Sequence, residues 1–227
     1  MYLVEDGLVR PVSGNLARGQ ASLSPTGSRI KDLCVSDDKN KVKGMKIFIA
    51  GPRAVTNLDR PFEKRLNGIV NKNYAILVGD APGVDKAVQS YFFSLNYPNV
   101  TVYASNGKAR TNVGKWPIKS VPVSDKTKGF DYYAAKDKAM ADSADYGFML
   151  WNGESRGTLT NIINLLTRDK EVLIYFTPKN SFVTVSSFER LDSVLSFCSD
   201  STKKLYHRIC SEHTNKHSQL SLYDKTL

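Results

Sequence analysis

The sequence predicts an α/β protein with a Rossmann-like domain of three layers, in which a mainly parallel sheet is covered by helices on both faces. Two observations lead to this prediction. Short, continuously apolar segments recur along the chain, and helical segments with one apolar face separate them. Continuous apolar strands are typical of a sheet buried on both sides, and parallel strands need crossover helices of this kind.

The first half of the domain is predicted to contain three strands and two helices. A strand is expected at 46–50, and Asp59 is placed to cap a helix over 60–73. A second strand is expected at 75–80 and a third at 99–105. Between them, apolar residues at helical spacing form one continuous stripe: Val84, Ala87, Val88, Tyr91, Phe92 and Leu95.

The second half begins with a long polar loop over 106–128. A helix is expected at 130–143, a strand at 146–151, a helix at 157–169 and a last strand at 171–177. The helix at 157–169 has an apolar side for the core, made of Leu159, Ile162, Ile163 and Leu166. Strands and helices therefore alternate throughout the domain.

Composition changes twice along the 227 residues and divides the chain into three parts. Residues 1–44 are rich in Gly, Ser and Pro without periodicity, so they are predicted to be a flexible N-terminal extension, with Met45 as a candidate natural start. Residues 45–199 form the Rossmann-like domain, and the hydrophobic content of the whole chain, 41%, is enough for a core. Residues 200–227 are predicted to be a polar C-terminal tail that buries little.

The composition favours a cytoplasmic protein with an anionic partner. No segment approaches the roughly 20 apolar residues of a membrane span, and no signal peptide is recognisable. Cys34, Cys198 and Cys210 form no disulfide framework and are expected to be reduced. The net charge of +10 suits a nucleic acid or a small anionic ligand, and it suits a solvated basic surface equally well.

The predicted tail contains all three histidines of the chain. On a helix, His207, Cys210, His213 and His217 would fall on one side, and these residue types suit zinc. The spacing matches no zinc finger, and a polar helix end explains it as well. We therefore predict no metal and no cofactor.

Three loops after predicted strands carry the residues expected to bind a ligand, because ligands of such sheets bind at the carboxyl ends of the strands. After the first strand, Gly51 allows close backbone approach and Arg53 offers a fork for phosphate. Two glycine-rich turns lead into helices whose first N–H groups can bind an anion. The candidates in these turns are Gly79, Asp80, Gly83 and Asp85 after the second strand, and Trp151, Gly153, Ser155, Gly157 and Thr158 after the fourth.

The polar loop over 106–128 is a candidate lid. Arg110, Asn112 and Trp116 offer a guanidinium fork, an amide that can read a base edge and a ring on which a base can stack. The alternative is a structural loop with Trp116 packed on the sheet. Lys136 and Lys138 on the next helix could reach the same ligand, but alternating charges on a helix are typical of its surface.

These segments also resemble a known superfamily. The stretches "IAGPRAV", "ILVGDAPGVDKAV", "VTVYASNGKARTNVGKW" and "AAKDKAMADSADYGFMLWNGESRGTLTNI" are similar to the SMF/DprA-LOG (SLOG) superfamily of Rossmann-like nucleotide-binding proteins, in particular its small bacterial and phage members. The resemblance covers about residues 45–180. It implies a nucleotide or nucleotide-derived ligand across the two glycine turns, and a homo-oligomer.

Relatives in this superfamily include phosphoribohydrolases, which cleave an N-glycosidic bond and carry a "PGGxGTxxE" turn. The equivalent turn here keeps Gly157 and Thr158 but has Asn161 where the resemblance places the catalytic Glu. We therefore predict a module that binds a nucleotide or a derivative without turning it over. The alternatives are a nucleoside-phosphate N-glycosidase with Glu154 and Asp80 as catalytic carboxylates, and a protein that binds single-stranded nucleic acid, as some relatives do.

Overall fold

The computed structural model describes the backbone of residues 44–223 and the side chains of residues 44–212. A seven-stranded sheet has the order β4-β3-β2-β1-β5-β6-β7. The strands are β1 (Lys46–Ala50), β2 (Ala75–Val78), β3 (Val100–Ser105), β4 (Ile118–Val121), β5 (Tyr146–Trp151), β6 (Val172–Phe176) and β7 (Ser181–Val185). All neighbours pair in parallel except β6 and β7.

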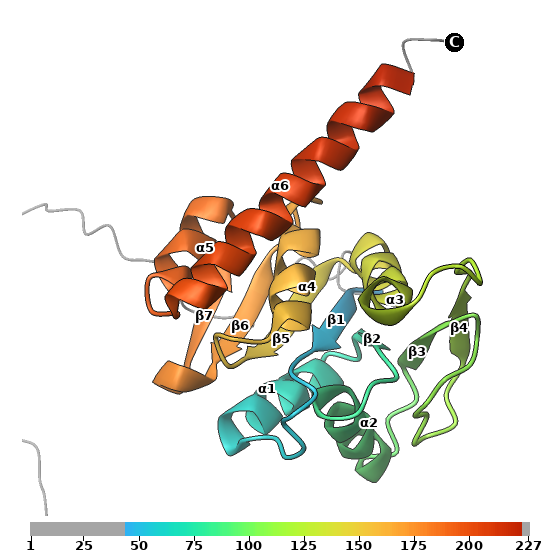
Figure 1. The fold of residues 1–227 in the computed structure, drawn as a ribbon. Coiled ribbons are helices and arrows are strands. Elements are labelled where there is room, and N and C mark those ends of the chain that lie inside the picture. The colour runs from blue at the N-terminus through green and yellow to red at the C-terminus, as the bar shows by residue number, and fades with distance from the viewer. Residues whose placement is uncertain (1–43, 224–227) are drawn as a thin grey trace, which may run out of the picture. The chain divides into compact units, whose positions relative to one another are not determined.

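Helices cover both faces of this sheet, which confirms the predicted three-layer α/β class (Figure 1). They are α1 (Arg60–Asn71), α2 (Val84–Ser94), α3 (Gly129–Ser143), α4 (Arg156–Leu166), α5 (Phe188–Leu195) and α6 (Asp200–Tyr223). One buried cluster joins the sheet to α1 and α2, and a second joins it to α3, α4, α5 and α6. None of the helices within residues 44–223 has both the length and the apolar content needed to cross a membrane.

The strands and helices predicted between 46 and 177 are present, with bounds that differ by a few residues at their ends. Asp59 stands at the N-cap of α1 as expected, although its side chain makes no capping hydrogen bond. No sequence pattern predicts β4, because this strand is short and solvent-exposed and lies within the polar loop. β7 and α5 were also missed, although both contribute residues to the core, including Val185 and Leu191.

The segment after Cys198 differs from the predicted tail at its beginning. Residues 200–223 form one long helix, α6, whose first turns pack against α4 and whose later turns extend away from the domain (Figure 1). Tyr206 and Ile209 belong to the core, and the buried Thr202 hydroxyl donates a hydrogen bond of 2.8 Å to the Gly153 carbonyl. The start of the predicted tail is therefore tied to the turn after β5. Residues 1–43 of the predicted extension lie outside the described residues.

The order of the strands places a topological switch point between β1 and β5. From β1 the chain builds β2, β3 and β4 on one side, and it then crosses to β5 on the other side of β1. At such a switch point the loops after the two central strands diverge, and ligands of doubly wound sheets bind there. The loops after β1 and β5, which contain Arg53 and Gly157, leave the sheet at this point.

Candidate functional site

The loops after β1 and β2 pack directly against each other. The Val84 N–H donates to the Pro52 carbonyl at 3.2 Å. Gly83 has a positive φ of 80°, and a Cβ at this position would lie 2.3 Å from the Arg53 carbonyl oxygen. Only glycine fits here without displacing the backbone. The Ala81 N–H also points inward and donates to the Asp85 carboxylate at 3.2 Å.

This turn was predicted to offer N–H groups to an anion. In the structure, two of its donors are used by acceptors of the protein itself, so the turn before α2 is more closed than expected. The difference arises because the loop after β1 covers it, a contact between segments that no local sequence pattern encodes. A role for Gly79, Gly83 and Asp85 in ligand binding stays a prediction.

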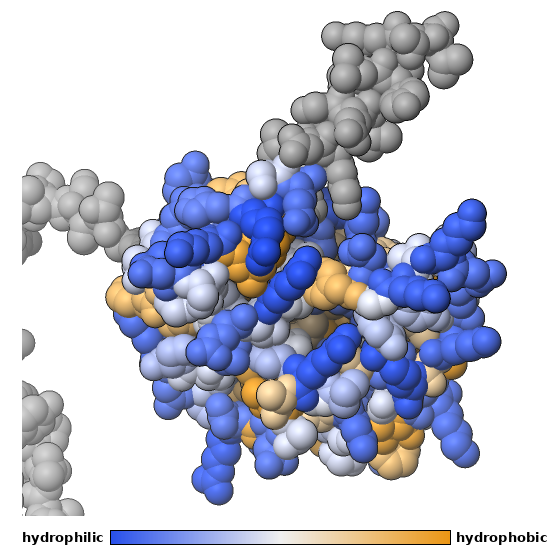
Figure 2. Space-filling view, viewed as in Figure 1, coloured by the Kyte–Doolittle hydropathy of each residue, from blue (hydrophilic) through white to orange (hydrophobic). Residues whose placement is uncertain are grey.

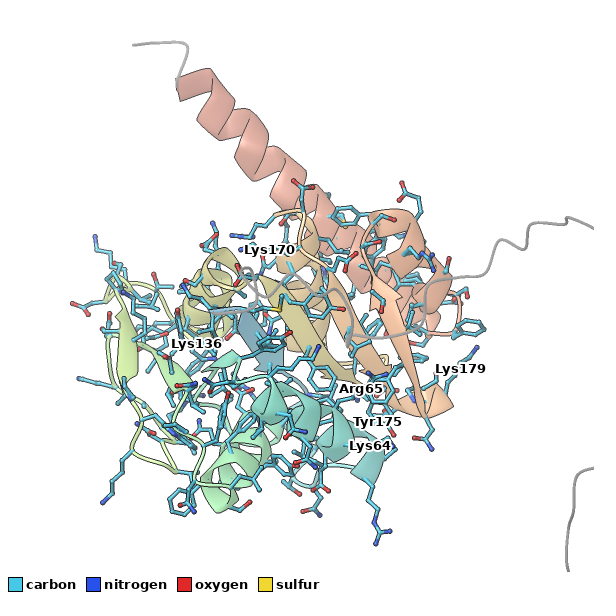
Figure 3. The ribbon with its side chains drawn as sticks, turned by 180° about the vertical axis from the view of Figure 1, so that it is seen from behind. Lys64, Arg65, Lys136, Lys170, Tyr175 and Lys179 are labelled. Carbon is cyan, nitrogen blue, oxygen red and sulfur yellow. The ribbon has the colours of Figure 1, made fainter. Side chains whose placement is uncertain are left out.

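Behind this turn lies a buried ionic cluster around Lys136 of α3. Its Nζ is 2.6 Å from a carboxylate oxygen of Asp137, 3.8 Å from Asp80 and 3.9 Å from Asp85. The side chain of Lys136 is only 4% exposed. Figure 3 marks the position of Lys136 on the ribbon. The prediction that Lys136 is a surface residue was therefore wrong, because α3 turns this position toward the turn before α2.

Asp80 is also held by Arg110. The guanidinium donates to both carboxylate oxygens, at 2.8 and 3.0 Å, and the Arg110 backbone N–H adds a third hydrogen bond of 3.0 Å. This bidentate contact uses the planar fork of arginine. Asp80 thus ties the loop after β3 to the turn after β2, and both of its carboxylate oxygens accept hydrogen bonds.

The cluster separates the pKa values of its two buried aspartates. Burial raises the pKa of Asp80, but the hydrogen bonds from Arg110 outweigh burial, so this carboxyl titrates below its ordinary value. Burial raises the pKa of Asp85 to about 6, and the Lys136 charge offsets only part of that effect. For Lys136, burial lowers the pKa, but the Asp137 and Asp85 charges outweigh it and the pKa is raised. The lysine therefore stays charged at neutral pH.

Gly79 allows the backbone to lie on this cluster. A Cβ at Gly79 would stand 2.3 Å from an Asp85 oxygen and 2.5 Å from Lys136 Nζ. The Gly79 carbonyl accepts a hydrogen bond of 2.8 Å from the buried Gln89 amide, whose oxygen accepts from the Val113 N–H at 2.9 Å. Sequence reasoning missed Gln89, because it lies outside the predicted apolar stripe of α2 and no local pattern marks it as buried.

The loop after β3, proposed from the sequence as a lid, is packed on the sheet up to β4. Trp116 is 9% exposed, and its Nε1 donates to the Tyr97 carbonyl at 3.0 Å. The Asn112 amide exchanges two hydrogen bonds with the Trp116 backbone, at 2.8 and 3.0 Å. The structure thus matches the structural alternative for Trp116 and Asn112. A role for Trp116 or Asn112 in ligand binding stays a prediction. Of the three candidates in this loop, Arg110 is the one that contacts another candidate site residue, Asp80.

Three arginines meet aromatic rings on the first turns of α3. The Cζ atoms of Arg110 and Arg53 lie 4.1 and 5.2 Å from the centre of the Tyr133 ring. The Cζ of Arg156 lies 4.1 Å from the centre of the Phe130 ring. Phe130 and Tyr133 are three residues apart on α3 and so share a face of the helix. We call Arg53, Arg110 and Arg156 the arginine row.

The arginine row is exposed, and its members differ in how they are paired. Arg110 is bound to Asp80, whereas no carboxylate of residues 44–212 lies within ion-pair distance of Arg53 or Arg156. Cation–π contacts orient these two guanidiniums without neutralising them. Arg156, Phe130 and Tyr133 were not identified from the sequence, since nothing local indicates that α3 and the start of α4 are adjacent.

The turn after β5 is built by two side-chain caps. Asn152 Oδ1 accepts hydrogen bonds from the N–H groups of Glu154 and Ser155, at 3.2 and 2.9 Å. Ser155 is the N-cap of α4, and its Oγ accepts from the Thr158 N–H at 3.4 Å and from the Thr158 hydroxyl at 3.0 Å. This is the usual role of serine before a helix.

These caps leave the first N–H groups of α4 free. The N–H groups of Arg156 and Gly157 find no acceptor in the described part of the chain, as is expected for the first two positions of a helix. No heavy atom lies within 4 Å of the position that a Cβ on Gly157 would take. Of the two predicted glycine turns, the one before α4 is therefore the open one.

Two further residues of this region point into the core. Trp151 is fully buried, and within the described part of the chain neither its Nε1 nor the Oδ1 of the buried Asn161 has a hydrogen-bond partner. Both residues lie in or beside the cluster that packs α4 on the sheet. Gly153 is also buried beneath Phe176. Ligand contacts by Trp151 and Gly153 stay predictions, whereas Ser155, Gly157 and Thr158 are placed at the helix start.

Within residues 44–212, no group of three or more His, Cys, Asp or Glu side chains is arranged so that it could hold a metal ion. The side chains of His213 and His217, which the sequence placed with His207 and Cys210, lie outside the described residues.

The chain was also compared with known proteins. It matches no protein-family model and no curated protein. Among solved structures it is similar to DNA processing protein A from Helicobacter pylori, described for its single-stranded DNA binding mode, with 13% identity and a TM-score of 0.47 over 74% of this chain and 81% of that chain. A likeness this low carries no argument about function, so the Rossmann-like fold rests on the strand order and layers of the chain itself.

Proposed function

We propose that the carboxyl edge of the sheet binds the phosphate of a nucleotide or nucleotide-derived ligand, between the first turn of α4 and Arg53, and that the protein recognises this ligand without turning it over. The observation that carries the proposal is the pairing of an open helix N-terminus with two guanidiniums that have no carboxylate partner among residues 44–212. Helix N-termini and arginine forks both favour phosphate. An exposed cation without a partner raises the affinity for an anion at the same place.

The rings beneath the arginines favour a nucleotide over inorganic phosphate. A guanidinium that lies flat on Phe130 or Tyr133 can present its other face to a base, as arginine planes do in nucleic-acid recognition. The phosphate would then lie at the N–H groups of Arg156 and Gly157. The base would lie toward α3.

Recognition without turnover is proposed because the nearby carboxylates other than Glu154 are engaged or buried. Asp80 is held in three hydrogen bonds by Arg110, and Asp85 lies beneath Gly79. Asn161 is a buried amide and cannot accept a proton as a carboxylate does. Glu154 is the exposed carboxylate of this turn, so it is the residue on which an N-glycosidase would depend.

Single-stranded nucleic acid is the second candidate ligand. The observation that favours it is the extent of the arginine row, which runs from the loop after β3 to α4 and offers more cations than one phosphate needs. The net charge of +10 acts in the same direction. A single strand would follow the row with successive phosphates and stack bases on the exposed rings.

Thermal shift and calorimetric titration distinguish these ligands. Adenosine mono-, di- and triphosphates, cyclic nucleotides and oligothymidylates of increasing length are compared at low and physiological salt. A nucleotide site predicts a dose-dependent rise of the thermal midpoint that salt changes little. A strand site predicts affinity that grows with oligonucleotide length and falls steeply with salt.

The variants Arg53→Ala and Arg156→Ala should each lower the affinity at least tenfold. Arg190→Ala is the matched control, since this exposed arginine lies on α5, which follows the opposite edge of the sheet. If neither nucleotides nor oligonucleotides bind, the proposal fails. Chromatography of nucleoside monophosphates incubated with the protein tests turnover: release of free base that Glu154→Gln abolishes would show an N-glycosidase instead.

A further inference from the structure

The edge strand β4 is unusual in being open, polar and flanked by prolines. It ends the sheet beyond β3, and no strand of the described residues pairs with its outer side (Figure 1). Three of its four residues are exposed, and Ile118 keeps 44% of its surface accessible. Pro117 precedes the strand and Pro122 follows it. An open edge of this kind is a template for another strand.

The hydrogen bonds of β3 show which groups of β4 face outward. The Val102 N–H donates to the Pro117 carbonyl at 3.0 Å, and the Asn106 N–H donates to the Val121 carbonyl at 2.8 Å. Alternate residues of a strand bond to the same neighbour, so Lys119 also faces β3. Ile118 and Ser120 therefore direct both their N–H and C=O groups away from the sheet.

The surroundings of β4 are strongly basic. Between residues 106 and 128 the chain has one acidic residue, Asp125, against six basic ones. Five of these are exposed lysines: Lys108, Lys115, Lys119, Lys126 and Lys128. Figure 2 shows hydrophilic side chains gathered at this end of the molecule. Such charges repel basic strands and disfavour apolar ones, which would have to cover a lysine.

We propose that the outer edge of β4 binds a short, extended, acidic segment of a partner protein, which adds to the sheet as a further strand. The outward N–H and C=O groups of Ile118 and Ser120 recur every second residue, at about 6.6 Å, which is the repeat of a peptide strand. A nucleic-acid backbone has no N–H groups to match them. The flanking lysines supply the attraction for acidic side chains.

The two faces of β4 specify the pattern of the bound segment. Lys119 and Val121 point to one face of the sheet, and Ile118 and Ser120 point to the other, because side chains alternate along a strand. An added strand therefore places acidic side chains beside Lys119 and apolar side chains beside Ile118. The prolines limit the ladder to Ile118–Val121, so binding is expected to be weak and reversible.

The full chain is tested with a fluorescein-labelled peptide in which Glu and Val alternate, followed by fluorescence anisotropy. Two control peptides have the same composition: one carries its Glu and Val residues in separate blocks, and one alternates but is N-methylated at every amide. The alternating peptide should bind at least tenfold more tightly than either. Equal binding of the N-methylated peptide would overturn the proposal, because charge alone would then explain the affinity.

Variants of β4 provide the matching test on the protein. Ser120→Pro removes an outward N–H while leaving the ladder to β3, and it should weaken binding at least tenfold; Ser120→Ala keeps the N–H and should not. Lys119→Glu should also weaken binding. The N-methylated peptide answers the same question if Ser120→Pro does not fold.

Displacement of the peptide by oligothymidylate without any effect of Ser120→Pro would assign the lysines to nucleic acid. Dimerisation of the free protein that Ser120→Pro abolishes would assign the edge to a second copy. Either outcome refutes the proposal.

Discussion

Replacing Lys136 by Met should destabilise the protein strongly, because this lysine neutralises buried carboxylates. Methionine has a similar length and is apolar, so the change removes the charge and leaves the packing of α3 largely intact. Asp80 would keep Arg110 as a partner. Asp85 and Asp137 would lose the cation that lies 3.9 and 2.6 Å from their oxygens.

The size of the effect follows from the burial of the cluster. Removing one partner of a buried ion pair costs about 3–5 kcal/mol, because the remaining charge stays in a medium that solvates it poorly. For a domain of this size, each kcal/mol lowers the thermal midpoint by about 2–4 °C. We therefore expect the midpoint of Lys136→Met to fall by about 6–20 °C.

Urea denaturation and calorimetry measure this loss, with Lys138→Met as the control. Lys138 is exposed on the same helix, so its replacement should change the free energy of unfolding by about 0.5 kcal/mol or less. The loss in Lys136→Met should be smaller at pH 5 than at pH 8, because protonation of Asp85 removes the uncompensated charge. Equal, small losses in both variants would refute the assignment of a buried ionic cluster.

Two other predictions concern the same region. Asp85 has a pKa of about 6 in the folded protein against an ordinary value of 3.8, so its contribution to stability is present at low pH and is lost as the pH rises from about 4 through about 6. The loss amounts to at most about 3 kcal/mol at about 1.4 kcal/mol per pKa unit. Asp85→Asn should flatten this part of the pH profile in urea titrations, and an unchanged slope would contradict it. Gly83→Ala should lower the free energy of unfolding by more than about 2 kcal/mol in the same assay, because the φ of Gly83 is 80° and a Cβ there would meet the Arg53 backbone. A Cβ at Gly157 has open space, so Gly157→Ala should be neutral or slightly stabilising.

The sequence predicts the layers of the fold well because they depend on local periodicity. The strands at β1, β2, β3, β5 and β6 are continuous apolar runs, and the helices between them have apolar stripes. β4 lacks this signal, since its exposed "IKSV" is stabilised by its pairing with β3. The start of α6 lacks it as well, because only Tyr206 and Ile209 of a polar segment reach the core.

The candidate site was predicted less completely than the fold, because its residues come from separate elements. Arg53 and Arg110 were recognised as forks, but the ring that joins them, Tyr133, is contributed by α3. The burial of Lys136 depends on the packing of α3 against the turn before α2, which sequence spacing cannot show. A charged residue on a helix is usually predicted to lie at the surface. Here three carboxylates around Lys136 stabilise its charge, so the lysine can be buried.

The two glycine turns look alike in the sequence, yet the structure gives them different chemistry. Before α2, the Arg53 backbone covers Gly83, the Val84 N–H is bound to Pro52, and the carboxylates Asp80 and Asp85 lie at the turn. Before α4, Gly157 faces open space with no carboxylate closer along the chain than the exposed Glu154. Phosphate is disfavoured beside buried carboxylates and favoured beside free N–H groups. A ligand at this edge should therefore place its phosphate at the start of α4 and extend along the first turns of α3 toward Arg53. It should not bridge both glycine turns. Arg156→Ala should therefore weaken ligand binding more than any change in the turn before α2 that leaves the protein folded.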